Sequence, residues 1–68
     1  MKLRDLERAL DKLPVEQREV ILLVGLEGMV YEEVAELLGV PVGTVRSRLH
    51  YATQKLADNL RQYVELKA

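Results

Sequence analysis

The sequence has no cysteine, tryptophan or phenylalanine, and only one histidine and three tyrosines among its 68 residues. Without cysteine there can be no disulfide framework and no thiolate metal site, and one histidine cannot hold a zinc ion alone, so we expect neither a metal nor another cofactor. The longest apolar stretch, residues 20–26, is far shorter than the roughly 20 residues that cross a bilayer. With no membrane insertion and no signal peptide in sight, the cytoplasm is the expected compartment.

The residues that are present suit one small all-α domain over residues 1–68. The composition is 49% hydrophobic and 31% charged, which is typical of a globular chain whose core consists of Leu, Val and Ala. The apolar spacing predicts helices and no strand. The first helix carries leucines at positions 3, 6, 10 and 13 on one stripe and stops at Pro14. The second runs from Pro14 to about position 26 and is apolar on more than one face, which favours central burial over a face for a partner.

A tight turn separates two further predicted helices. The third covers about residues 31–38, with Val34, Ala35, Leu37 and Leu38 inward and three glutamates outward. Gly39 is expected to end it in the left-handed conformation. The fourth helix starts near Val42 and extends beyond position 60 on a long apolar stripe, while the role of residues 61–68 stays open. The stripe consists of Val45, Leu49, Ala52, Leu56, Leu60 and Tyr63.

Charge is divided unevenly along the chain. Residues 1–39 carry five basic and nine acidic side chains, whereas residues 40–68 carry five basic and two acidic ones, although the whole chain has a net charge of −1. Attraction to phosphate acts locally at physiological salt, so a surface that faces DNA is expected in the cationic C-terminal half.

Residues 31–51 have the spacing of a helix-turn-helix. Ala35 is small where two helices would cross, Gly39 lies four residues later at the turn, and Val45 follows six residues after that, where a branched side chain can plug the second helix into the first. Leu49 extends this inner face. The second helix of such a unit enters the major groove with its N-terminal residues against base edges.

The outward positions of that second helix are the candidate DNA contacts. Arg46 and Ser47 are predicted to contact bases, because arginine can donate two bonds to guanine and serine can bond to base edges. Thr44 and Arg48 are predicted to contact phosphates. The remaining outward positions are Gly43, His50 and Tyr51.

The stretch Leu13-Pro-Val-Glu-Gln-Arg-Glu-Val-Ile-Leu-Leu, followed by Tyr31-Glu-Glu-Val-Ala-Glu-Leu-Leu-Gly-Val-Pro-Val-Gly-Thr-Val-Arg-Ser-Arg-Leu-His, resembles region 4 of the sigma-70 family. The similarity covers about residues 5–60 and is closest to the extracytoplasmic-function (ECF) group. It implies a compact four-helix domain, of the winged-helix-like or three- to four-helix bundle type, that reads the −35 promoter element in transcription initiation. In that family the positions of Arg46, Ser47, His50 and Tyr51 face the −35 bases.

The same resemblance implies protein partners. Family members dock on the flap of the RNA polymerase β subunit through an apolar groove, which would give Ile21, Leu22 and Val24 a second role, and anti-sigma factors often cover the same surfaces. The family's region that binds the −10 element has no counterpart here, so we expect an excised domain of a longer protein, with a stand-alone sigma-like protein as the alternative.

Three positions depart from the family pattern. Val30 stands where Ser or Thr usually caps the third helix, so a backbone N–H needs another partner or water. Tyr51 and Thr53 stand where arginines are common, and the loss of two cations should weaken phosphate attraction or change the sequence preference.

Two other functions remain open from the residues. The output domain of a response regulator shares the four-helix plan and would dimerise through its last helix, although the Leu-Pro-x-x-x-Arg motif at residues 13–18 favours the sigma pattern. A helical protein-interaction module without DNA binding would use the acidic half and the second helix. An enzyme is not expected, because His50 has no nucleophile or carboxylate at an activating spacing, and Glu32, Glu33 and Glu36 fit a solvated helix face.

Overall fold

The computed structural model describes residues 2–65 of the chain. They form α1 (Leu3–Asp11), α2 (Val15–Ile21), a π-helical turn η1 (Leu22–Leu26), α3 (Tyr31–Leu38) and α4 (Val42–Glu65), with no strand among them. The expected all-α architecture of four helices is therefore confirmed. The π-helical turn, which continues α2, is the one element that the apolar spacing did not predict. Of the open C-terminal segment, residues up to 65 continue α4, and Leu66 lies outside the described residues.

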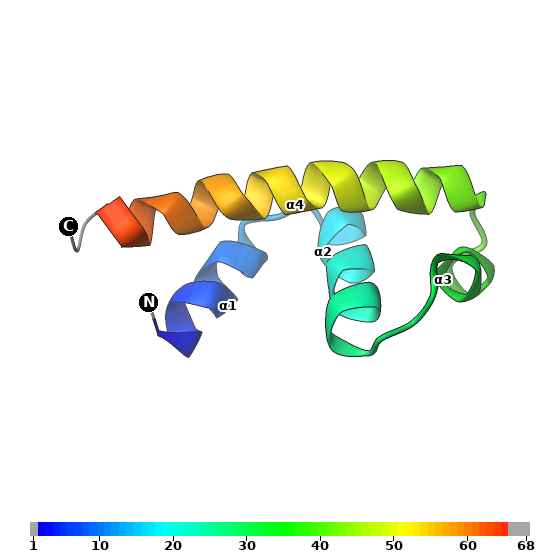
Figure 1. Ribbon diagram of the computed structural model, residues 1–68, viewed down its shortest axis with the longest axis horizontal. Coiled ribbons are helices and arrows are strands. Elements are labelled where there is room, and N and C mark those ends of the chain that lie inside the picture. The colour runs from blue at the N-terminus through cyan, green and yellow to red at the C-terminus, as the bar shows by residue number, and fades with distance from the viewer. Residues whose placement is uncertain (1, 66–68) are drawn as a thin grey trace.

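The 24-residue helix α4 runs along the whole molecule. The three shorter helices lie along one side of it, with α3 near its N-terminal end, α2 at the middle and α1 toward its C-terminal end (Figure 1). The molecule is elongated, 41 × 18 × 16 Å, because α4 extends beyond the helices that pack on it.

The core lies where α2, α3 and α4 meet. Val20, Val34 and Val45, one from each helix, are fully buried, and Ala35 and Ala52 complete the cluster. Small and β-branched side chains allow the three helix axes to approach closely. This part of the core supports the helix-turn-helix, since α3 and the first turns of α4 both pack on α2 or on its π-helical continuation.

Helix α1 packs on α4 rather than on the central cluster. Ala9 is the buried residue of α1, Leu13 is buried just after the helix, and the buried Asn59 of α4 contacts Ala9. The Asn59 Nδ2 donates a hydrogen bond of 3.1 Å to the backbone carbonyl of Ala9. That carbonyl belongs to the last turn of α1, where helix geometry leaves C=O groups without partners, so Asn59 satisfies one of them across the interface.

Two expectations about burial need correction. Leu37 was expected to face inward, but its side chain is 61% exposed. The buried side of α3 is centred on Val34, Ala35 and Leu38, and a residue three positions after Val34 and one before Leu38 lies about a third of a turn away from that centre. The central burial expected for the second helix holds fully only for Val20, whereas the four apolar residues that follow it are half-buried and Leu26 is 77% exposed.

Candidate nucleic-acid interface and apolar groove

The turn between α3 and α4 sets the relative orientation of these two helices. Gly39 has a φ of 69°, in the left-handed region that glycine reaches without a Cβ clash. The backbone N–H of Gly39 donates to the carbonyl of Glu36 at 3.3 Å, and that of Val40 donates to the carbonyl of Ala35 at 3.0 Å. These two bonds are those of the Schellman motif, which reverses the chain directly after α3. On the inner side of the unit Ala35 and Val45 are buried and Leu49 is half-buried.

The outer face of the first turns of α4 is polar and open to solvent. Arg46, Ser47 and His50 are exposed, and Tyr51 is 59% exposed. Residues four apart share a row along a helix, so Arg46 lies on the row of His50, and Ser47 on that of Tyr51. Thr44 and Arg48 are half-buried at the edges of this face.

A shallow hollow of about 440 Å³ adjoins these rows between α3 and α4. It is lined by Arg46, Leu49, His50, Thr53 and, from the start of α3, Tyr31. Tyr31 was not among the candidate contacts, because the pattern placed it at a helix start and did not show which helix its ring would face. The hollow offers a phenol, a guanidinium and an imidazole within one concave surface.

Two side chains on this face have interactions of their own. The Thr53 hydroxyl donates to the backbone carbonyl of Leu49 at 2.7 Å, so its proton is engaged within the helix. The rings of His50 and Tyr51 meet edge to face, with centroids 5.4 Å apart and planes inclined by 69°. Such packing restricts both rings to a narrow range of orientations.

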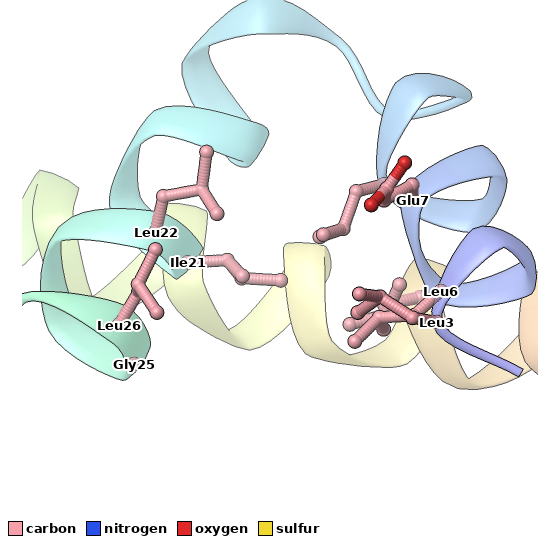
Figure 2. Close-up of a pocket in the computed structure, with 9 residues that line it drawn as sticks. Leu3, Leu6, Glu7, Ile21, Leu22, Gly25 and Leu26 are labelled. Atoms are coloured by element: carbon pink, nitrogen blue, oxygen red, sulfur yellow. The ribbon is translucent and has the colours of Figure 1, made fainter.

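A second concave surface lies on the opposite half of the molecule, between α1 and the segment formed by α2 and η1. This groove has a volume of about 420 Å³, and Leu56 of α4 also lines it. Figure 2 shows Leu3, Leu6 and Glu7 on the α1 side and Ile21, Leu22 and Leu26 on the facing side. Its two most exposed leucines are Leu3, 71% exposed, and Leu26, 77% exposed. The residues that line it are Leu3, Leu6, Glu7, Leu10, Ile21, Leu22, Gly25, Leu26 and Leu56.

The predicted docking residues divide between this groove and the core. Ile21 and Leu22 line the groove, whereas Val24 packs against the central cluster instead. Of the predicted leucine stripe of the first helix, at positions 3, 6, 10 and 13, only Leu13 is buried. The apolar stripe of the first helix was the signal in the sequence for this groove.

The described residues offer no site for a metal ion. Within residues 2–65 no three His, Asp or Glu side chains come together in a way that could hold one. Nor does this part of the chain contain a helix that is long and apolar enough to cross a membrane.

A helix-turn-helix on a four-helix frame, with an open polar face on its second helix, defines the class of small helical domains that bind DNA. Within that class, the chain belongs to the family described as sigma-70, region 4, whose model matches residues 3–56. The family membership favours the sigma interpretation over the response-regulator alternative.

Similar proteins of known identity are ECF sigma factors, as the resemblance implied. The chain is 49% identical over 59 residues to the ECF RNA polymerase sigma factor SigE of Mycolicibacterium smegmatis, a match that covers 87% of the chain and 23% of that protein. It is 44% identical over 57 residues to the sigma factor EcfG of Rhodopseudomonas palustris, covering 84% of the chain and 32% of that protein. The chain thus spans a third or less of the length of these relatives.

A solved structure has the same fold. It is the co-crystal structure of the sigma factor RpoE in complex with the anti-sigma factor NepR from Bartonella quintana, with a TM-score of 0.86 and 38% sequence identity. The match covers 90% of the present chain and 38% of the other.

Proposed function

We propose that this chain binds the −35 promoter element as the C-terminal domain of an ECF sigma factor and so directs RNA polymerase in transcription initiation. The observation that carries the proposal is the exposed outer face formed by Arg46, Ser47, His50 and Tyr51 on the second helix of a helix-turn-helix. The first turns of such a helix are the part that reaches base edges in the major groove. The role is one of binding in the cytoplasm and needs neither catalysis nor a cofactor.

The side chains divide this work by their position. Arg46 and Ser47, exposed on adjacent rows, contact base edges, and Arg46 supplies the bidentate donor pair that suits guanine. Thr44 and Arg48, at the edges of the face, bond to phosphates and fix the register on the duplex. Tyr31 extends the surface toward the DNA backbone from the start of α3, the helix that crosses the backbone in this class of domain.

The apolar groove is the proposed docking surface for protein partners, the β-flap of RNA polymerase core and an anti-sigma factor. Its support is the pair of leucines, Leu3 and Leu26, that folding leaves largely in solvent on either side of the groove. Exposed apolar surface of this kind marks protein interaction sites. The relative of known structure was solved in complex with an anti-sigma factor, which supports such a partner here.

The DNA-binding part is tested by selecting duplexes from a randomised pool and then measuring affinity for the selected site. Arg46→Ala should weaken binding by about 1–3 kcal/mol and relax the preference at one base pair. The control is Lys55→Ala, which removes one cation from the same helix on the side away from Arg46, nine residues or half a turn of rotation further along. Equal losses for both variants, with no change in base preference, would indicate nonspecific attraction and contradict base reading by Arg46.

The same selection separates the proposal from a pure protein-interaction module. A module of that kind would enrich no sequence from the pool while still binding a β-flap fragment. A sigma domain should enrich an asymmetric site, because a single helix-turn-helix contacts one half-site.

A further inference from the structure

Glu7 of α1 is the only charged side chain among the nine residues that line the apolar groove (Figure 2). Its side chain is exposed and makes no ion pair or hydrogen bond within the described part of the chain. Arg4, three residues earlier on the same helix, does not approach it closely enough to pair, and the next acid on this face, Asp11, has the same sign. The groove therefore has an apolar lining with one uncompensated negative charge.

The charges on the two walls explain why Glu7 lacks a partner. At the closed end of the groove, where α1 leads into α2, Asp11 pairs with Arg18 at 3.7 Å. One helical turn away from that end, α1 places Glu7 on the groove while α2 places Leu22 there, four residues after Arg18. A third turn brings Leu3 and Leu26. Glu7 therefore has a leucine, Leu22, and no basic side chain opposite it on α2 and η1.

We propose that this groove selects an amphipathic partner helix that carries a lysine or arginine beside its apolar stripe, and that Glu7 is the residue that pairs with this cation. The inference rests on the proposed docking function of the groove and specifies its partner. Helix α1, with nine residues, is about 14 Å long, so a helix lying in the groove contacts it over two to three turns. The apolar stripe of the partner fills the space above Leu56, and its cation meets Glu7.

The carboxylate also disfavours wrong partners. A helix without a cation would cover Glu7 and remove water from an unpaired charge, which costs binding energy. A second copy of this chain is disfavoured too, because residues 1–39 carry nine acidic and five basic side chains and two such surfaces repel. An acidic docking surface instead attracts a basic helix from a distance and speeds its encounter.

The test uses the 68-residue chain and a set of designed helical peptides, with binding followed by fluorescence anisotropy. All peptides share one leucine stripe. Within a set, three peptides differ only at one position beside this stripe, which is Lys, Gln or Glu. From one set to the next, this position moves along the peptide, so that each set tests a different register against Glu7. The wild-type chain is compared with Glu7→Gln, with Glu7→Lys and with Glu16→Gln, a control that removes an exposed acid of α2 outside the groove. In at least one register, wild type and the control should bind the Lys peptide about fivefold tighter than the Gln peptide. Glu7→Gln should lose this preference, and Glu7→Lys should prefer the Glu peptide.

Leu26→Asp separates this inference from the docking proposal. Leu26 is mostly exposed, so the variant should fold, as circular dichroism can verify, and should lose binding of every peptide. If peptides bind the wild type and Leu26→Asp abolishes binding, but Lys, Gln and Glu peptides bind equally in all registers, the selection by Glu7 is wrong and the docking surface stands. If Leu26→Asp binds as well as wild type, the docking surface itself is wrong. A dimer in sedimentation equilibrium that Leu26→Asp disrupts would also overturn the inference, since a second copy would then occupy the groove.

Discussion

Single residues at its two ends define the extent of α3. At the start, the Val30 N–H donates to the Glu33 side chain at 3.1 Å. Valine has no side-chain acceptor, so only this half of a capping box exists. The Glu33 carboxylate thus satisfies the Val30 N–H, while the N–H groups that a Ser or Thr side chain would have capped gain no partner from Val30. At the other end, the left-handed Gly39 stops the helix and starts the turn toward α4.

Gly39 and Gly43 lie four residues apart and should respond in opposite ways to alanine. A Cβ at either position would meet no atom within 4 Å, so only the backbone decides. At Gly39, alanine must adopt the left-handed conformation, and we expect the free energy of unfolding to fall by about 1–2 kcal/mol. Gly43 lies in the first turn of α4 without a positive φ, so alanine there should raise it by about 0.5–1 kcal/mol. Urea denaturation of both variants measures the difference, and a loss at both positions would contradict the argument.

At the scale of elements, α1 is attached to the rest of the molecule mainly through α4. Toward α4 it is held by the packing of Ala9 and by the bond from Asn59 to the Ala9 carbonyl, and just after the helix Leu13 is buried and the Lys12 ammonium lies 5.6 Å from the centroid of the Tyr63 ring. Toward α2 the ion pair of Asp11 with Arg18, at 3.7 Å and mostly exposed on the aspartate side, adds a weak contact. The side of α1 toward α2 borders the groove instead of packing on its neighbour. A helix held on one side by few contacts is the part of this fold most readily released.

Asn59→Ala should loosen α1 selectively. The substitution leaves the buried carbonyl of Ala9 without its donor, which costs about 1–3 kcal/mol in the free energy of unfolding. Amide exchange in α1 should accelerate more than exchange in α3 and the first half of α4. Gln62→Ala, at an exposed position of the same helix, is the control and should change stability by less than about 0.5 kcal/mol. Uniform acceleration across all helices would mean that α1 does not open independently.

The sequence alone predicted the elements far better than their lateral arrangement. Four helices and the stop at Gly39 followed from spacing and from glycine chemistry, which are local properties. Burial did not follow in the same way, because periodicity identifies an apolar face without saying what covers it. Leu3 and Leu26 could thus be assigned to apolar helices, and only the placement of α1 beside α4 shows that they border a groove.

In the candidate site, too, features within one helix could be predicted from the sequence, whereas features that depend on packing between helices could not. The outward positions in the first turns of α4 could be predicted from Val45 and Leu49, because the inner face of a helix fixes its outer face. The places of Tyr31 and Glu7 could not be predicted in this way. Tyr31 lines the hollow together with residues of α4, and Glu7 lines the groove together with residues of α2, η1 and α4, so both places depend on how separate helices pack. Asn59 stayed hidden for a related reason: it interrupts an apolar stripe, and its partner is a backbone carbonyl 50 residues away.

At the scale of the whole molecule, the two concave surfaces use different parts of α4 and differ in charge: the hollow is lined by residues from Arg46 to Thr53, and the groove by Leu56. The groove borders α1 and α2 in the half of the chain with an excess of acidic side chains, whereas the hollow at α3 and α4 includes Arg46 and His50. Under the proposed function, DNA and a partner protein would therefore bind without competing for the same residues. It also leaves few cations on the DNA side, so binding by the isolated chain should be weak and its salt dependence shallow.

Thr53→Arg tests that electrostatic limit. Thr53 is exposed, lines the hollow beside Arg46 and His50, and engages its hydroxyl only with the carbonyl of Leu49. An arginine there can reach a phosphate of a duplex bound to the recognition helix, and each new phosphate contact should steepen the plot of log affinity against log salt by about 0.9. The variant should therefore bind the selected duplex more tightly at low salt and lose this advantage as salt rises.

The matched control for that measurement is Thr53→Ala, which removes the same hydroxyl without adding charge. Its salt slope should equal that of the wild-type chain, because the hydroxyl proton is held within the helix and not by DNA. If Thr53→Arg raised affinity equally at all salt concentrations, the gain would come from base or packing contacts rather than from a phosphate. If neither affinity nor slope changed, position 53 would lie away from the duplex, and the DNA-facing surface would be confined to the first three turns of α4, up to Tyr51.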